Sequence, residues 1–281
     1  MSFDTQTCGV LYVATGTRHL AEAVRSAQSF RKHMPHVPII LYTDQVNVAG
    51  EPFTEIRKIE RPLHSLGDKI LPLRETPFER TLFLDTDTYV CAPIQDLFDI
   101  LDRFDLAASH APYRPARPSV TPDCFCELNS GVIAYRLKPE TVRFFDKWFQ
   151  LYQTFVETTG TTNANDQPMF RQALYESSIG VYILPPEYNL RTVMPGFSGR
   201  GAVKILHGRG IPMQQLENWI NGSRNIRIFL SSPRQLTREH FEILSPNGRC
   251  ITAFLTTFIW PLVKVESILQ PWKRRFFKID Q

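Results

Sequence analysis

Short apolar runs and amphipathic segments alternate along the first half of the chain. Residues 9–14 are a run of strand formers, and residues 38–43 are a second such run, which ends at Asp44. Between the two runs, apolar side chains recur at helical spacing, at Leu20, Ala23, Val24, Ala27 and Phe30. A strand, a helix and a strand in this order predict two parallel strands that are joined by a right-handed crossover.

The same alternation continues and indicates the fold class. A buried strand is expected to begin at Thr81 and to carry Asp85 and Asp87 at its end. Further strands are expected at 56–59, 106–109 and 131–135, and helices at 67–73 and 139–155. Pro139 is well placed in the first turn of the last helix. The pattern predicts an α/β protein, a three-layer sandwich with a mostly parallel central sheet.

Polar residues follow several of these strands. In a parallel sheet, ligands lie beyond the carboxyl ends of the strands, where Asp85 and Asp87, residues 14–17 and Asp44 are expected to meet. Residues i and i+2 of a strand point to the same face, so the two carboxylates of Asp85-Thr86-Asp87 would project together. Unpaired, they would repel each other and lose hydration. A divalent cation that carries a diphosphate would remove both problems; the alternative is a pair of solvated turn residues.

Composition narrows the class of protein. The 281 residues suffice for one large or two small domains, and 43% hydrophobic and 21% charged residues are ordinary for a globular chain. A net charge of +4 is too small to argue for nucleic acid and is compatible with anionic ligands or a lipid surface. Five cysteines do not indicate a disulfide framework. The N-terminus lacks the pattern of a signal peptide, so a cytoplasmic location is expected.

Four further segments place polar residues in apolar surroundings: 127–133, 165–170, 184–189 and 204–210. Together with Asp85-Thr86-Asp87, and in this order, they resemble the motifs of the GT-A nucleotide-sugar glycosyltransferases. The likeness is greatest to the group of glycogenin and the bacterial lipopolysaccharide galactosyltransferases, and it covers roughly residues 8 to 210. It implies a GT-A, Rossmann-like fold.

The resemblance also implies roles for individual residues. Asp85 and Asp87, with Thr86 between them, match the Asp-x-Asp motif that binds a metal and the donor diphosphate, and His207 resembles the third metal ligand. Two carboxylates and an imidazole suit Mn²⁺, with Mg²⁺ as the alternative. The remaining matches are to the donor-sugar loop (Asn129, Ser130, Gly131), to the pair near the reacting sugar (Asp166, Gln167), to the uridine site (Tyr12, Ala14, Thr15) and to a basic residue that faces the sugar or phosphate (Lys69).

One departure from the family pattern concerns the residues after the histidine. Members usually carry a lysine several residues further on, whereas Gly208-Arg209-Gly210 follows His207 directly. Arg209 is expected to replace that lysine as a phosphate contact, because a guanidinium binds phosphate through two parallel hydrogen bonds.

Structural alternatives stay open for most of these residues. Asp166 would also suit the cap of a helix that runs to Glu176, and Asn129 and Ser130 would suit a turn before a strand. His207 would also suit a surface position or a satisfied core position, and Lys69 a solvated one.

The C-terminal part has a different character. Residues 1–232 are expected to form the catalytic domain, and 233–281 a helical extension that is rich in basic and aromatic residues. Its apolar run, 251–263, is shorter than the ~20 residues that span a bilayer. Two interpretations remain open: a peripheral anchor at the inner face of a membrane, or a helix packed on the catalytic domain.

The sequence thus predicts a metal-dependent glycosyltransferase that moves a sugar from a nucleotide-diphosphate donor, a UDP-sugar before others, to a hydroxyl of a glycan or a lipid-linked glycan. Two alternatives are a sugar-nucleotide pyrophosphorylase, which shares much of the fold, and a non-catalytic protein that binds sugar nucleotides or membranes.

Overall fold

A seven-stranded sheet forms the centre of the computed structural model, which describes residues 7–46, 48, 50–111, 120–192, 196–210, 212–222, 227–231, 241–244 and 250–253. The strand order is β3-β2-β1-β4-β7-β6-β8. Their bounds are Cys8–Ala14 (β1), Ile39–Thr43 (β2), Glu55–Lys58 (β3), Arg80–Leu84 (β4), Leu106–His110 (β6), Leu128–Arg136 (β7) and Val181–Leu184 (β8). Within this sheet β7 runs antiparallel to both neighbours, and the other pairs are parallel. The predicted mostly parallel sheet is confirmed.

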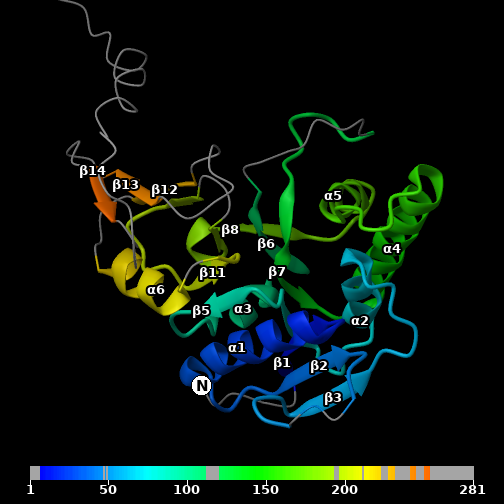
Figure 1. The fold of residues 1–281 in the computed structure, drawn as a ribbon. Helices are drawn as coiled ribbons and strands as arrows, with labels where there is room; N and C mark the ends of the chain where they lie inside the picture. The colour runs from blue at the N-terminus through cyan, green and yellow to red at the C-terminus, as the bar shows by residue number, and fades with distance from the viewer. Residues whose placement is uncertain are drawn as a thin grey trace, which may run out of the picture.

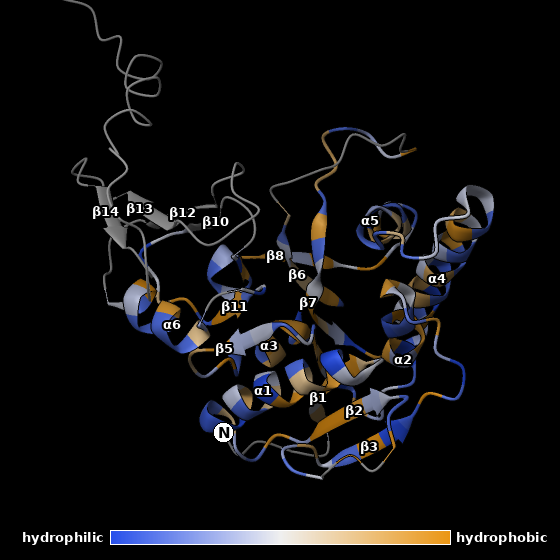
Figure 2. Cartoon of the chain, in the orientation of Figure 1, coloured by the Kyte–Doolittle hydropathy of each residue, from blue (hydrophilic) through white to orange (hydrophobic). Residues whose placement is uncertain are grey.

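Helices cover both faces of this sheet, which makes the three layers (Figure 1). The helices are α1 (Thr17–His33), α2 (Ile70–Arg74), α3 (Asp96–Asp99), α4 (Pro139–Thr159) and α5 (Gln167–Tyr175), with short 3₁₀ turns at Leu66–Lys69 and Ile100–Asp102. One apolar core joins the sheet to α1 and α3, and a second joins its other face to α2, α4 and α5. In Figure 2 the strand β2 is mostly apolar, whereas α1 carries both polar and apolar positions.

Local sequence explains where the helices begin and end. Helix α4 has Pro139 at its first position, where a missing N–H costs nothing, and it ends before Gly160, whose φ is 66°. Helix α1 follows Gly16, whose φ of 82° favours glycine and redirects the chain after β1. These ends place the turn after β1 at the same edge of the sheet as the end of β4.

A small three-stranded sheet lies beside that edge. It has the order β5-β11-β9, with β5 at Thr88–Val90, β9 at Leu190–Arg191 and β11 at Ile205–His207. The chain enters β5 from β4 after only three residues, and β11 pairs antiparallel with β5, so that His207 is opposite Thr88. The sheet therefore carries a residue from late in the sequence to the end of β4.

The C-terminal segments that the structure describes are strands. A four-stranded sheet, β10-β12-β13-β14, contains Gly196–Ser198, Arg227–Ser231, Phe241–Leu244 and Cys250–Ala253; helix α6 (Met213–Asn221) precedes β12. The helical extension expected for 233–281 is thus absent from its two described segments, and β13 pairs with β12 across the predicted boundary at residue 232. Most of the apolar run and the basic, aromatic residues after it fall outside the described residues. Among the described helices, none is both long and apolar enough to cross a bilayer.

Candidate functional site

The segment Asp85-Thr86-Asp87 is a turn between two strands, and not the end of one strand as predicted. Strand β4 ends at Leu84 and β5 begins at Thr88, while the Thr88 N–H donates to the Asp85 carbonyl at 3.1 Å. The Asp85 N–H donates to the carbonyl of Gly131 in β7, at 2.7 Å. The two carboxylates therefore meet because the chain bends, and not because alternate residues of a strand share a face.

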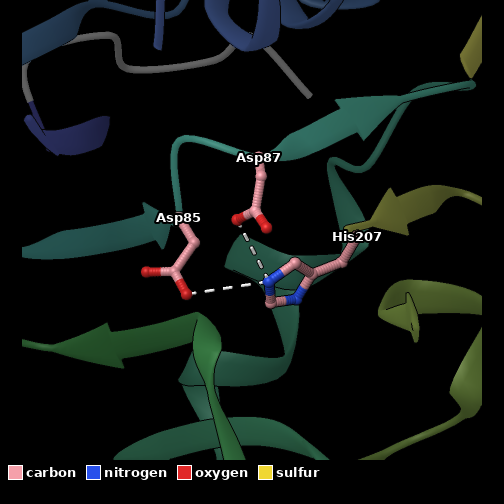
Figure 3. Close-up of side chains that lie close together, drawn as sticks. All are labelled: Asp85, Asp87 and His207. Atoms are coloured by element: carbon pink, nitrogen blue, oxygen red, sulfur yellow. Dashed lines mark ion pairs between the residues drawn. The ribbon is translucent and has the colours of Figure 1, made fainter. Parts of the chain in front are cut away.

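Asp85, Asp87 and His207 form a cluster in which one ligand atom of each lies within 4.8 Å of the others. His207 Nε2 is 3.3 Å from Asp87 Oδ1 and 3.7 Å from Asp85 Oδ2 (Figure 3). The ring is almost fully buried, whereas both carboxylates keep some exposure. Two carboxylates and one imidazole nitrogen that converge from one side are a donor set for a transition-series or alkaline-earth dication.

Gly131 leaves the space that this cluster needs. A Cβ at position 131 would lie 2.2 Å from His207 Cε1 and 2.5 Å from Asp85 Oδ2. The sequence suggested that this glycine lets backbone approach a ligand. The space beside it is instead filled by two of the three members of the cluster.

The guanidinium of Arg209 lies against the cluster. Arg209 Nη1 is 2.9 Å from Asp87 Oδ2, and the same guanidinium donates to both carboxylate oxygens of Glu22, at 2.8 and 2.7 Å. Burial opposes ionisation of Asp87, but His207 and then Arg209 outweigh it and hold the pKa of Asp87 well below its usual range. Sequence reasoning did not identify Glu22. The sequence shows that Glu22, Ser26 and Ser29 form a polar row at helical spacing, but only the structure shows that all three are buried.

Lys69 is a buried cation on the other side of Asp85. Its ammonium is 3.4 Å from Asp85 Oδ1 and 3.2 Å from Asp166 Oδ2, and it also donates to the carbonyl and the hydroxyl of Ser130. Burial by itself would lower the pKa of Lys69, but Asp166 and Asp85 outweigh it and the pKa is raised. A solvated position for Lys69 is excluded by its exposure of 7%.

The side chain of Asp166 does not cap α5. It accepts from the Ser130 hydroxyl at 2.7 Å, and the N–H of Gln167 donates to Asn165 instead. Burial raises the pKa of Asp166, and the ammonium of Lys69 only partly offsets this effect. Gln167 is more exposed; it accepts from Asn129 at 2.7 Å and donates to Glu127.

The expected uridine residues lie on two sides of β1. Tyr12 and Ala14 are buried in the core under α1, and the Tyr12 hydroxyl bonds Ser26 at 2.9 Å. Neither lines the cleft beside the cluster, whereas Val13 and Thr15 do. Because successive residues of a strand face opposite sides, a contact of the Tyr12 side chain with a ligand does not fit this position.

The cleft has a volume of about 810 Å³, and most of the residues that line it are polar. Of the predicted residues, its walls include Thr15, Lys69, Asp85, Thr86, Asp87, Asn129, Asp166, Gln167, His207 and Arg209. Ser130 and Gly131 lie behind this wall, in contact with Lys69 and His207 respectively. Arg191 also lines the cleft, beside His207 in the register of β9 and β11. Its Nε is buried without a hydrogen-bond partner in the described part of the chain.

Comparisons with known proteins bear on the fold. No family model matches the sequence, and no curated protein matches it. Among solved structures, the galactosyltransferase LgtC, in complex with donor and acceptor sugar analogues, is 18% identical with a TM-score of 0.49, covering 72% of this chain and 87% of its own. Mouse xyloside xylosyltransferase 1 is 18% identical with a TM-score of 0.47, covering 73% and 100%.

The bifunctional glycosyltransferase WbbM gives a TM-score of 0.50 at 14% identity, over 75% of this chain and 47% of its own. At such identities a likeness speaks for the fold alone. The described residues have the GT-A glycosyltransferase fold that the sequence predicted, with its mostly parallel sheet and its polar cleft at the carboxyl ends of the strands.

Proposed function

We propose that this protein is a metal-dependent glycosyltransferase that moves a sugar from a nucleotide-diphosphate donor, a UDP-sugar, to a hydroxyl of a glycan or a lipid-linked glycan. The cluster of Asp85, Asp87 and His207 at the wall of the cleft carries this proposal. It would hold a divalent cation, which would supply the positive charge that a diphosphate leaving group needs, at the edge of the sheet where α/β proteins bind ligands.

Asp85, Asp87 and His207 would hold the metal ion, for which Mn²⁺ is the first choice and Mg²⁺ the alternative. When bound, such an ion stabilises negative charge on the departing nucleoside diphosphate. Arg209 adds a second positive charge beside Asp87, with two of its nitrogens held by Glu22. This arrangement supports Arg209 as a diphosphate contact, because Glu22 fixes the plane of the guanidinium.

Lys69 contacts Asp85 on the side of the carboxylate that faces away from His207. It lies on Oδ1 of Asp85 while Oδ2 of the same carboxylate faces His207, so Lys69 leaves the second oxygen for the cation. It also neutralises Asp166, which would otherwise repel Asp85 across the same space. We therefore assign Lys69 a positioning role in place of the contact with the sugar or phosphate that the resemblance implied.

Gln167 and Asp166 stand near the sugar in the proposed complex. Gln167 lines the cleft with its amide set between Asn129 and Glu127, which suits recognition of sugar hydroxyls. Asp166 lines the cleft through a small exposed fraction, and Ser130 and Lys69 hold its Oδ2. As a general base on the acceptor hydroxyl it would give inversion; attack from the side of the leaving group would give retention.

A screen of UDP- and GDP-sugars for hydrolysis with Mn²⁺ tests the proposal, because such transferases often hydrolyse a fitting donor slowly without an acceptor. We expect UDP release that depends on the metal and is lost in Asp87→Ala, with no loss in Asp146→Ala, an exposed acid on α4. Release of pyrophosphate would favour the pyrophosphorylase. Calorimetric binding of UDP-sugars without turnover, with any glycan acceptor tried, would favour the non-catalytic alternative.

A further inference from the structure

A row of three amides connects the backbone of β7 to the imidazole of His207. The Gly131 N–H donates to Oδ1 of Asn129 at 3.1 Å, and Nδ2 of Asn189 donates to the same oxygen at 2.8 Å. Oδ1 of Asn189 lies 2.8 Å from Nδ1 of His207. Asn189 and His207 are almost fully buried, at 4% and 3% exposure, so water has little access to these bonds.

The direction of every bond in this row follows from its first member. A backbone N–H can only donate, so the atom of Asn129 that faces Gly131 must be the amide oxygen. The atom of Asn189 that faces this oxygen must then be its NH₂ group. Its own oxygen is left to face His207, and because an amide oxygen only accepts, Nδ1 of His207 must carry a proton.

We infer that Asn189 and Asn129 fix the tautomer of His207 with its proton on Nδ1, so that the lone pair of Nε2 is directed between Asp85 and Asp87 for a cation. In the other tautomer, lone pairs of Nδ1 and of the Asn189 oxygen would face each other at 2.8 Å. The inference deepens the proposed metal site, on which it rests for the identity of the cation. It makes Asn189, which does not line the cleft, a positioning residue.

The same row extends toward the proposed sugar site. Because Oδ1 of Asn129 faces Gly131, its Nδ2 must donate to Gln167, which is 2.7 Å away. Gln167 then accepts with its oxygen and has its own NH₂ for Glu127. One backbone N–H in β7 thus determines which nitrogen of His207 is protonated in one series of hydrogen bonds, and which way the amide of Gln167 points in the other.

The experiment measures the tautomer directly. Long-range ¹⁵N–¹H spectra of the imidazoles in the metal-free protein, at a pH that makes the rings neutral, are compared with those of His207→Gln to identify His207. We expect a protonated Nδ1 and an unprotonated Nε2 for His207. Protonation on Nε2 in the neutral ring would overturn the inference.

Two substitutions at position 189 separate this role from simple packing. Asn189→Leu removes the acceptor, and we expect Mn²⁺ affinity, measured calorimetrically, to fall about 10- to 100-fold, the range found when the hydrogen-bond partner of a metal-bound histidine is removed. Asn189→Asp keeps an acceptor for Nδ1 although it loses the donor to Asn129, so the Nδ1–H tautomer should remain and Mn²⁺ affinity should fall less than in Asn189→Leu. A folded Asn189→Leu variant with wild-type Mn²⁺ affinity would also overturn the inference.

Asn221→Leu is the matched control. Asn221 on α6 bonds the backbone of Val203 in the same way, through both amide groups, but outside the cleft. Its loss should lower thermal stability and leave both the His207 tautomer and Mn²⁺ affinity unchanged. Because the tautomer is measured without metal, donor or acceptor, a failed hydrolysis screen with an Nδ1–H imidazole would reject the proposed function and leave this inference standing.

Discussion

Gly131 and His207 are in such close contact that a methyl group at position 131 would lie 2.2 Å from Cε1 of the imidazole. The same methyl group would lie 2.5 Å from Oδ2 of Asp85, so neither side chain has room to yield toward the other. We expect Gly131→Ala to spread the cluster, to weaken Mn²⁺ binding at least tenfold, and to lower stability by about 1–3 kcal/mol through overpacking. Calorimetric titration with Mn²⁺ and denaturant unfolding measure the two effects.

Gly180→Ala is the control for this substitution. A Cβ at Gly180 would have its nearest neighbour, Asp105 Oδ2, at 3.6 Å, which is ordinary contact. We expect this variant to bind Mn²⁺ like the wild type. Wild-type Mn²⁺ affinity in Gly131→Ala would mean that the three ligand atoms do not act together.

Tyr12 supports the turn at Asp85 from inside the core. The Asp85 carbonyl accepts from the Thr88 hydroxyl at 2.8 Å, Ser26 lies 2.7 Å from that hydroxyl, and Tyr12 lies 2.9 Å from Ser26. Since the carbonyl can only accept, each hydroxyl donates toward it, and Tyr12 begins the series. We expect Tyr12→Phe to lower the free energy of unfolding by about 1–3 kcal/mol and to leave UDP affinity within about twofold of the wild type.

Denaturant unfolding and titration with UDP and Mn²⁺ distinguish this role from the sequence-based one. A direct uridine contact would give the opposite result for Tyr12→Phe: unchanged stability and a clear loss of UDP affinity. Tyr42→Phe is a suitable control, because Tyr42 on β2 bonds backbone and Arg57 on the side of the sheet that faces away from Tyr12.

Between residues 9 and 160 the sequence predicted most strands and helices, because each buried run is bounded by polar or special residues, as Pro139 and Gly160 bound α4. It could not predict which residues of β1 face the cleft. The run 9–14 is apolar throughout, since both faces of the sheet are covered. Such a run does not show which of its alternating side chains face one side of the sheet and which face the other. Tyr12 was therefore expected to face the cleft, whereas Val13 faces it in the structure.

Long-range contacts set a second limit. Asp85 and Asp87 were recognisable from two residues in sequence, but Glu22 meets Arg209 across 187 residues and Asn189 meets His207 across 18. Nothing in one sequence pairs such positions. Even the motif that was recognised adopts a turn, because strand β5 must leave the central sheet to pair with β11.

Glu22 holds Arg209 through two hydrogen bonds, and the Thr86 hydroxyl donates to the same carboxylate at 3.2 Å. Burial raises the pKa of Glu22, but hydrogen bonds from Arg209 outweigh it and keep the pKa below its usual range. We expect Glu22→Gln to lower the free energy of unfolding by about 1–3 kcal/mol and to raise the KM for the donor, since Arg209 loses its fixed plane.

A double-mutant cycle of Glu22→Gln with Arg209→Met measures how far the two side chains depend on each other. As a control, Glu55→Gln breaks the partly exposed pair with Arg57 and should cost less than about 1 kcal/mol. Additive effects of the Glu22 and Arg209 substitutions on KM would contradict the role of Glu22.

Asp105 gives a pH dependence that is independent of the cleft. Its carboxylate is 2.5 Å from Lys138 Nζ and accepts from the Gly180 N–H at 2.7 Å; these contacts outweigh burial and lower the pKa of Asp105. A lowered pKa in the folded state stabilises the protein above the unfolded value of about 3.9, and this stability is lost as the pH falls through the folded pKa. The stability difference between wild type and Asp105→Asn should therefore be constant from about pH 5 to 7 and shrink below about pH 4. Urea unfolding at several pH values measures it, and a difference that grows on acidification would contradict the assignment.

Arg191 is a cation in the cleft for which the described residues provide no hydrogen bond and no counter-ion, whereas Lys69 and Arg209 are each paired with two acids. A guanidinium whose Nε is buried and unpartnered lowers the stability of the free protein, and an anionic ligand would offset this cost. We expect Arg191→Met to unfold at the same or a higher temperature than the wild type and to bind its anionic ligand at least tenfold more weakly. Titration with UDP and Mn²⁺, and then with glycans that do or do not carry a carboxylate or phosphate, shows whether that anion belongs to the donor or the acceptor.

Arg143→Met, at an exposed pair on α4, controls for loss of charge. A destabilised Arg191→Met variant with unchanged affinity for all of these ligands would make Arg191 a structural residue.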